Sequence, residues 1–191
     1  SALMLRARLP LAVVMTPVIV GAILLAEPFI SLWLGEELGQ RRGPVAVILL
    51  VGVWINALAY IPYAYLQGMG RPDLTAKLHL SELLPYFALL WLAVQSLGVV
   101  GAALAWTIRV GVDAILLFVL AGGAWPDIRP IMLGGLLVLG AALSAWLWFD
   151  SLMIHMVLGI GLGLLTMYWI AQYAPEELRS LSASILRRQC V

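Results

Sequence analysis

Apolar residues fill six long stretches of the chain, and short segments rich in Gly, Pro and charged residues separate them. About 20 helical residues cross a hydrocarbon core of roughly 30 Å, because every backbone polar group must be hydrogen-bonded within the segment. Runs such as residues 45–53 lack the alternation of apolar and polar side chains found in membrane β-strands. The pattern therefore predicts an all-α integral membrane helical bundle of six transmembrane helices, over residues 9–34, 44–68, 76–97, 99–121, 130–149 and 151–173.

Turn-forming residues lie at the predicted connections between these helices. The third and fourth spans are so close that residues 96–98 must form a tight hairpin. The bundle takes up residues 1–174, and residues 175–191 form a short polar tail that suits the membrane surface. The other predicted breaks are at 35–37, 40–44, 68–73 and 125–127.

The composition agrees with this pattern and excludes other classes of protein. Of the 191 residues, 63% are hydrophobic and 11% are charged. A soluble domain carries about 25% charged residues, so this chain cannot cover a water-facing surface. A net charge of +1 gives no general attraction for nucleic acid, which we do not expect as a partner. Because the chain starts at Ser1 and not at Met, we expect a fragment or a processed chain.

Basic residues are distributed unequally over the two sides of the predicted bundle. Eight of them lie on the side that holds both termini and two on the other, while Arg109 lies inside a span. Because cytoplasmic loops are enriched in Lys and Arg, the count predicts that both termini are cytoplasmic. The eight are Arg6, Arg8, Arg71, Lys77, Arg129, Arg179, Arg187 and Arg188, and the two are Arg41 and Arg42.

A stripe of polar side chains follows the second predicted span: Asn56, Tyr60, Tyr63 and Gln67. Their increments of 4, 3 and 4 residues place all four on one face of a helix. Such a stripe either lines a wet cavity or packs against another helix through hydrogen bonds worth about 0.6–2 kcal/mol each. We consider these four residues candidates for cavity lining or substrate binding.

The third and fourth spans carry ionisable residues where charge is expensive. Glu82 lies on a stripe with His79 and Tyr86, and Arg109 lies four residues before Asp113. Glu82 and Asp113 are candidates for ion coupling or for ion pairs with a basic partner.

Arg109 has two interpretations that the sequence leaves open. Its planar guanidinium suits a phosphate or carboxylate, which makes it a candidate substrate contact. Alternatively, a buried ion pair of Arg109 with Asp113 or Glu82 fixes the register of the helices.

The remaining candidates do not point to an enzyme. A cytoplasmic loop and the helix that follows it carry Arg71, Asp73, Lys77 and His79. The chain lacks HExxH, CxxC and GxxxxGK[ST] motifs and has two His and one Cys. We therefore expect no catalytic residue, no metal site and no cofactor.

Two segments resemble the later half of bacterial polysaccharide and oligosaccharide flippases of the O-antigen type. They read YLQGMGRPDLTAKLH over residues 65–79 and GVVGAALAWTIR over residues 98–109. Residues 28–35, PFISLWLG, resemble the end of the preceding helix in that family. These flippases belong to the superfamily that also holds multidrug extruders and lipid II flippases, and the resemblance covers roughly residues 10–120.

The resemblance implies the C-terminal lobe of a flippase with the multidrug-extruder-like fold, plus two extra helices. Such a protein moves lipid-linked oligosaccharide or polysaccharide precursors across the bacterial inner membrane by alternating access. It implies Arg109 as a pyrophosphate or acidic-sugar contact, and Glu82 or Asp113 as the coupling site. The implied partners are the glycan substrate, membrane lipid, the missing N-terminal half, and a glycan polymerase or other assembly proteins. The alternatives are a multidrug or small-molecule antiporter of the same superfamily and a non-transporting scaffold subunit.

Overall fold

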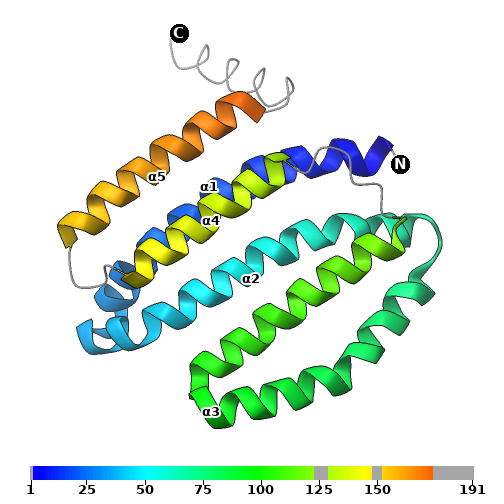
Figure 1. Ribbon diagram of the computed structural model, residues 1–191, viewed down its shortest axis with the longest axis horizontal. Helices are drawn as coiled ribbons and strands as arrows, with labels where there is room; N and C mark the ends of the chain where they lie inside the picture. Colours follow the sequence, from blue (N-terminus) through cyan, green and yellow to red (C-terminus); the bar gives the residue numbers. More distant parts are fainter. Residues whose placement is uncertain (1, 123–128, 148–151, 174–191) are drawn as a thin grey trace.

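The computed structural model describes residues 2–122, 129–147 and 152–173, which form five α-helices and no strand. The helices run roughly side by side in an elongated bundle (Figure 1). The predicted all-helical fold is thus confirmed for the described residues, whereas the predicted tail 175–191 and the break at 125–127 lie outside them. The helices are α1 (Ala2–Leu34), α2 (Glu36–Gly68), α3 (Pro72–Leu120), α4 (Arg129–Leu147) and α5 (Leu152–Tyr173).

Within the described residues, four stretches are long and apolar enough to cross a membrane: Leu9–Leu34, Gly43–Gly68, Pro72–Leu120 and Arg129–Trp146. Large apolar side chains cover much of the outer surface, as a bilayer-facing surface requires. Leu84, for example, is 82% exposed and Trp91 is 68% exposed. The chain thus has the build of a multi-pass membrane protein, and the count of six spans stays a prediction.

The connection between α1 and α2 differs from the sequence prediction. The sequence predicts breaks at 35–37 and 40–44, but Gly35 alone separates the two helices, and α2 continues through Pro44. Gly35 has φ of 92°, a conformation that glycine adopts at no steric cost. Glu36 and Glu37 then lie in the first turn of α2, where the helix dipole stabilises negatively charged side chains. The expected loop is therefore largely helix.

The element α3 is a hairpin of two helical arms, which Figure 1 shows running down and back along the bundle. Gly98 joins the arms with φ of 60° and ψ of −133°, inside the expected turn at 96–98. We call residues 72–97 the first arm and residues 99–120 the second arm. Near the turn, Gly101 lies so close to the carbonyl of Ala93 that a Cβ atom would overlap it. Small residues thus allow the arms to meet there.

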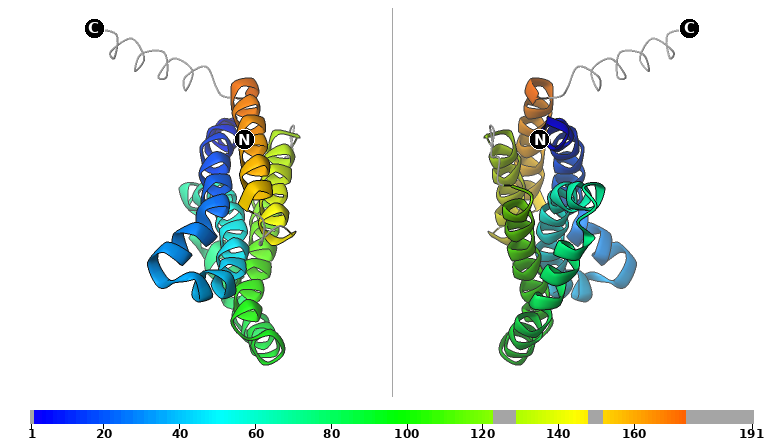
Figure 2. Two further views of the ribbon diagram at one scale, coloured as in Figure 1. Left: turned by 90° about the vertical axis from the view of Figure 1, so that its left-hand side faces the viewer. Right: turned by 90° about the vertical axis from the view of Figure 1, so that its right-hand side faces the viewer.

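The helices pack in two groups that share α2. The first group surrounds α1, which contacts α2, α4 and α5, and Figure 2 shows α3 at the opposite side of the bundle from α5. In this core the Trp54 indole donates a hydrogen bond to the Thr16 hydroxyl at 3.1 Å. The second group is α3 on α2, and Leu78, Leu66 and Leu117 form its apolar core. Its polar groups form the site described below.

Gly52 allows the second arm of α3 to approach α2. A Cβ atom at Gly52 would overlap the Trp106 ring and the Thr107 hydroxyl, which donates to the carbonyl of Ile48 at 3.0 Å. We expect Gly52→Ala to lower the free energy of unfolding by about 1–3 kcal/mol, the usual cost of overpacking. The measurement is thermal unfolding of the detergent-solubilised protein.

Gly111 provides the matched control. It lies in the second arm, and a Cβ atom added there would meet nothing within 4 Å apart from its chain neighbours and the nearby backbone of its own helix. Gly111→Ala should leave the midpoint unchanged or raise it, because Ala favours a helix by up to about 1 kcal/mol over Gly. Equal midpoints for the Gly52→Ala and Gly111→Ala proteins would contradict the proposed close approach.

Candidate functional site

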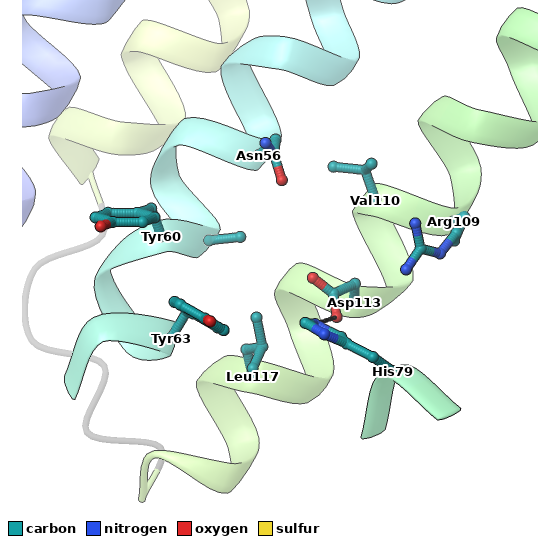
Figure 3. Close-up of a pocket in the computed structure, with 9 residues that line it drawn as sticks. Asn56, Tyr60, Tyr63, His79, Arg109, Val110, Asp113 and Leu117 are labelled. Atoms are coloured by element: carbon teal, nitrogen blue, oxygen red, sulfur yellow. Dashed lines mark ion pairs between the residues drawn. The ribbon is translucent and has the colours of Figure 1, made fainter. Parts of the chain in front are cut away.

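A cavity of about 270 Å³ lies between α2 and α3. Figure 3 shows side chains from both helices directed toward it. Ala59, Val110 and Leu117 add apolar contacts, but most of the lining is polar. The polar lining residues are Asn56, Tyr60 and Tyr63 from α2 and His79, Arg109 and Asp113 from α3.

The contribution of α2 is an aromatic wall. Tyr60 and Tyr63 have ring centroids 5.9 Å apart, and the Tyr63 ring stacks on His79 with centroids 6.1 Å apart and planes at 9°. Tyr60 is 65% exposed. Helical spacing brings these residues together with Asn56, as the stripe in the sequence predicted.

Gln67 does not line this cavity, although the stripe places it on the same helical face. Its amide donates a hydrogen bond to the Thr75 hydroxyl at 3.0 Å, and that hydroxyl donates to the carbonyl of Pro72 at 2.9 Å. Gln67 therefore holds the turn between α2 and α3. The expected cavity lining ends one helical turn earlier, at Tyr63.

The two arms of α3 are joined by an Arg109–Glu82 ion pair and by a contact between His79 and Asp113, which is an ion pair only when His79 is protonated. His79 Nε2 lies 3.2 Å from Asp113 Oδ1, and Arg109 Nε lies 3.5 Å from Glu82 Oε2. The partner of Arg109 is thus Glu82 across the hairpin, not its neighbour Asp113 on the same helix. His79, which the sequence assigned to the cytoplasmic loop region, lies within α3 and lines the cavity.

We call these four residues the charge cluster, in which the two acids are well shielded, whereas His79 is 42% exposed. The side chains of Glu82 and Asp113 are 9% and 12% exposed, and that of Arg109 is 29% exposed. The ring of Tyr86 lies 5.3 Å from the Arg109 guanidinium carbon, a cation–π contact.

The ion pairs leave hydrogen-bonding capacity unused. Within the described part of the chain, the buried atoms without a hydrogen-bond partner include both carboxyl oxygens of Glu82, Oδ1 of Asp113 and Nε of Arg109. An unsatisfied buried charged group costs more than the about 1–3 kcal/mol of a neutral one. The cluster thus has capacity for hydrogen bonds beyond its own contacts.

A second cavity, of about 260 Å³, lies between the arms of α3. Arg109 lines both cavities, so its guanidinium lies at their boundary. Glu82 and Tyr86 also line the second cavity, whose walls are mainly apolar: Pro85, Leu89, Ile108, Val112 and Leu116. Sequence reasoning did not predict this second cavity, because it depends on the distance between the two arms.

The remaining sequence candidates form a separate, exposed group at the start of α3. Arg71 Nε lies 3.3 Å from Asp73 Oδ1, and Lys77 Nζ lies 3.6 Å from Asp73 Oδ2. Their side chains are 46–76% exposed, so water screens these pairs and they contribute little to stability. Neither cavity includes them. Among the described residues, no group of three or more His, Cys, Asp or Glu is placed to hold a metal ion.

Apolar helices around a polar, charged cavity define the general class of a multi-pass membrane protein with an internal site. Over 101 residues, which are 53% of the chain, the sequence is 41% identical to a Shigella flexneri protein described as "Putative O-antigen transporter". The match spans 24% of that protein's length. No protein-family model and no solved structure matches the chain. The similarity to an O-antigen transporter confirms the resemblance found in the two sequence segments.

The charge cluster makes an asymmetric prediction for stability. Arg109→Gln leaves two acids without their arginine, and loss of one partner of a buried pair costs about 3–5 kcal/mol. Glu82→Gln should lower the free energy of unfolding by less, because the positive charge of Arg109 and the negative charge of Asp113 remain and cancel. The variant that carries both Arg109→Gln and Glu82→Gln should be more stable than the Arg109→Gln variant. Chemical or thermal unfolding in detergent measures all three.

Asp73→Asn is the matched control for these variants, because it removes an exposed acid from the same helix. Its unfolding midpoint should stay close to that of the unmodified protein, because water screens exposed ion pairs. A Glu82→Gln variant that is less stable than Arg109→Gln would contradict the charge balance of the cluster.

Proposed function

We propose that this chain is part of a flippase that translocates lipid-linked oligosaccharide or polysaccharide precursors across the bacterial inner membrane. Transport proceeds by alternating access of a central cavity, without covalent chemistry. The observation that carries the proposal is Arg109, shielded inside an apolar hairpin at the edge of a polar cavity, in a chain similar to an O-antigen transporter. That relative is a transporter by description, which favours transport over an enzymatic activity.

The partners follow from the same proposal. The chain matches about a quarter of its relative, so further helices of the same transporter complete the central cavity. Membrane lipid covers the exposed apolar surface. Both termini lie in the cytoplasm, and a glycan polymerase or other assembly proteins act on the exported glycan.

The lining of the cavity supports an anionic glycan as the substrate. Arg109 offers a planar fork of donors for a phosphate or an acidic sugar, and His79 lies near it. Tyr60 and Tyr63 offer flat apolar faces, and the amide of Asn56 offers both a donor and an acceptor. Sugar rings that carry a charged group suit this combination, because they present both hydroxyl groups and a negative charge. Glu82 and Asp113 are the proposed coupling residues.

Replacement of Arg109 tests the proposed anion contact. In the protein that contains this chain, Arg109→Ala and Arg109→Gln should reduce glycan export at least tenfold, because loss of a charge-assisted hydrogen bond costs about 1.5–3 kcal/mol. Arg109→Lys should retain part of the activity, since it keeps the charge but not the fork. The measurement is surface glycan in a flippase-deficient strain, at matched membrane expression.

Lys77→Gln is the control, because it removes an exposed positive charge outside both cavities. Undiminished export by Arg109→Gln would remove Arg109 from the site. Resistance of the same strain to lipophilic cations is measured in parallel. If the chain supports that resistance and does not support glycan export, the transporter is a small-molecule antiporter.

Tyr60 tests the aromatic wall. Tyr60→Ala should reduce export several-fold, whereas Tyr60→Phe should retain it, because stacking needs the ring and not the hydroxyl. Phe87→Ala serves as the control: Phe87 is 60% exposed on the first arm and lines neither described cavity. Equal export by the Tyr60→Ala and Phe87→Ala proteins would exclude a contact between Tyr60 and the glycan.

A further inference from the structure

The charge cluster has more acid than base. Glu82 and Asp113 supply two negative charges, Arg109 supplies one positive charge, and His79 is neutral unless it is protonated. With every acid ionised and His79 neutral, the cluster therefore carries one net negative charge. An anion that approaches Arg109 in this state meets repulsion from both carboxylates.

One added proton balances the charges and also supplies a missing hydrogen bond. A protonated carboxyl is a donor, and Glu82 Oε1, Glu82 Oε2 and Asp113 Oδ1 have no hydrogen-bond partner within the described residues. A proton on either acid therefore gives the cluster a donor that it lacks when both acids are ionised. Two carboxylates in one cluster with a single arginine also repel each other, and the proton relieves that repulsion.

The same proton weakens the electrostatic attraction between Glu82 and Arg109. The contact of Arg109 Nε with Glu82 Oε2, at 3.5 Å, lacks hydrogen-bond geometry. In Figure 3 the guanidinium points toward the cavity that Asp113 and His79 also line. A neutral acid at position 82 attracts Arg109 less strongly, so the guanidinium becomes available to an anion in the cavity.

We propose that the charge cluster binds one phosphate-type anion at Arg109 together with one proton shared by His79, Glu82 and Asp113, so that each favours the other. This inference rests on the proposed function only in naming the anion as the pyrophosphate of a lipid-linked glycan. Because the groups are coupled, the proton belongs to the cluster and not to one residue. The reciprocal effect follows from linkage: proton uptake strengthens anion binding by the factor by which the anion strengthens proton binding.

Among the described residues, no other charged side chain of the neighbouring elements lines the cavity at the cluster. The element packed against α3 is α2, whose titratable residues at the cavity are Tyr60 and Tyr63. Within α3, Tyr86 contacts Arg109, whereas Lys77 pairs with Asp73 at the exposed end of the first arm. The pH dependence therefore reports on His79, Glu82 and Asp113.

The test measures proton uptake together with binding. The purified protein that contains this chain, in phosphatidylcholine nanodiscs, is titrated calorimetrically with a pyrophosphate diester that carries one sugar and a short isoprenoid chain. The charge of this probe is constant between about pH 6 and 8, the range in which an unperturbed His titrates. Buffers of different ionisation enthalpy report the number of protons taken up per bound probe.

We expect the unmodified protein to take up close to one proton per bound probe toward the upper end of this range. Its affinity should fall as the pH rises, by up to about tenfold per pH unit. Glu82→Gln should bind the probe at high pH as tightly as the unmodified protein does at low pH, with little proton uptake. Arg109→Gln should lose binding at every pH, and Asp73→Asn should match the unmodified protein.

Asp113→Asn also removes one acid of the cluster, and it replaces Glu82→Gln in the test if that variant does not fold. Affinity that is independent of pH, without proton uptake, would overturn the linkage, and so would an unmodified pH dependence in both acid variants. Export assays separate this result from the proposed function. Linked binding without glycan export refutes the flippase function alone, whereas export with pH-independent binding refutes the linkage alone.

Discussion

The charge cluster inside the α3 hairpin is the constraint on which the site depends. A charge at this depth is costly unless it is paired, so the two arms must stay close enough for Arg109 to reach Glu82 and for His79 to reach Asp113. Gly98 makes the reversal that sets this register, and Gly101 lets the arms meet beside it. Two glycines thus determine which acid faces which base.

The polar cavity exists because α2 presents its polar stripe to this cluster. Gly52 brings α2 close to the second arm at one level, and Leu66 and Leu78 close the contact at another. Between these two apolar contacts lie Tyr63, stacked on His79, and the cavity of about 270 Å³. The rings and the charged groups do not fill the space as aliphatic side chains would. The same interface therefore both fixes the helices and leaves room for a ligand.

The sequence predicted what depends on hydropathy and on spacing within one helix, and it missed what depends on contacts between helices. Apolar length predicted the helices, and the increments along α2 predicted that its polar residues share one face, with cavity lining and helix packing both open. The sequence left Asp113 and Glu82 open as partners of Arg109, and spacing within one helix placed Gln67 in the cavity. The structure pairs Arg109 with Glu82 from the other arm, and the Thr75 hydroxyl accepts a hydrogen bond from the Gln67 amide. The residues around Gly35 became helix because one glycine was enough for the turn.

The attachment of the first arm of α3 links the charges to the shape of the site. The arm is held by Leu78 near its start and by the contact of Ala93 with Gly101 near the hairpin turn. Between these points lie the ion pairs, the contact of Tyr86 with Arg109 and the second cavity. Apolar contacts keep their strength when the cluster changes its protonation, but ion pairs do not. The middle of this arm is therefore the part of the described structure whose packing depends most directly on the charge of the cluster.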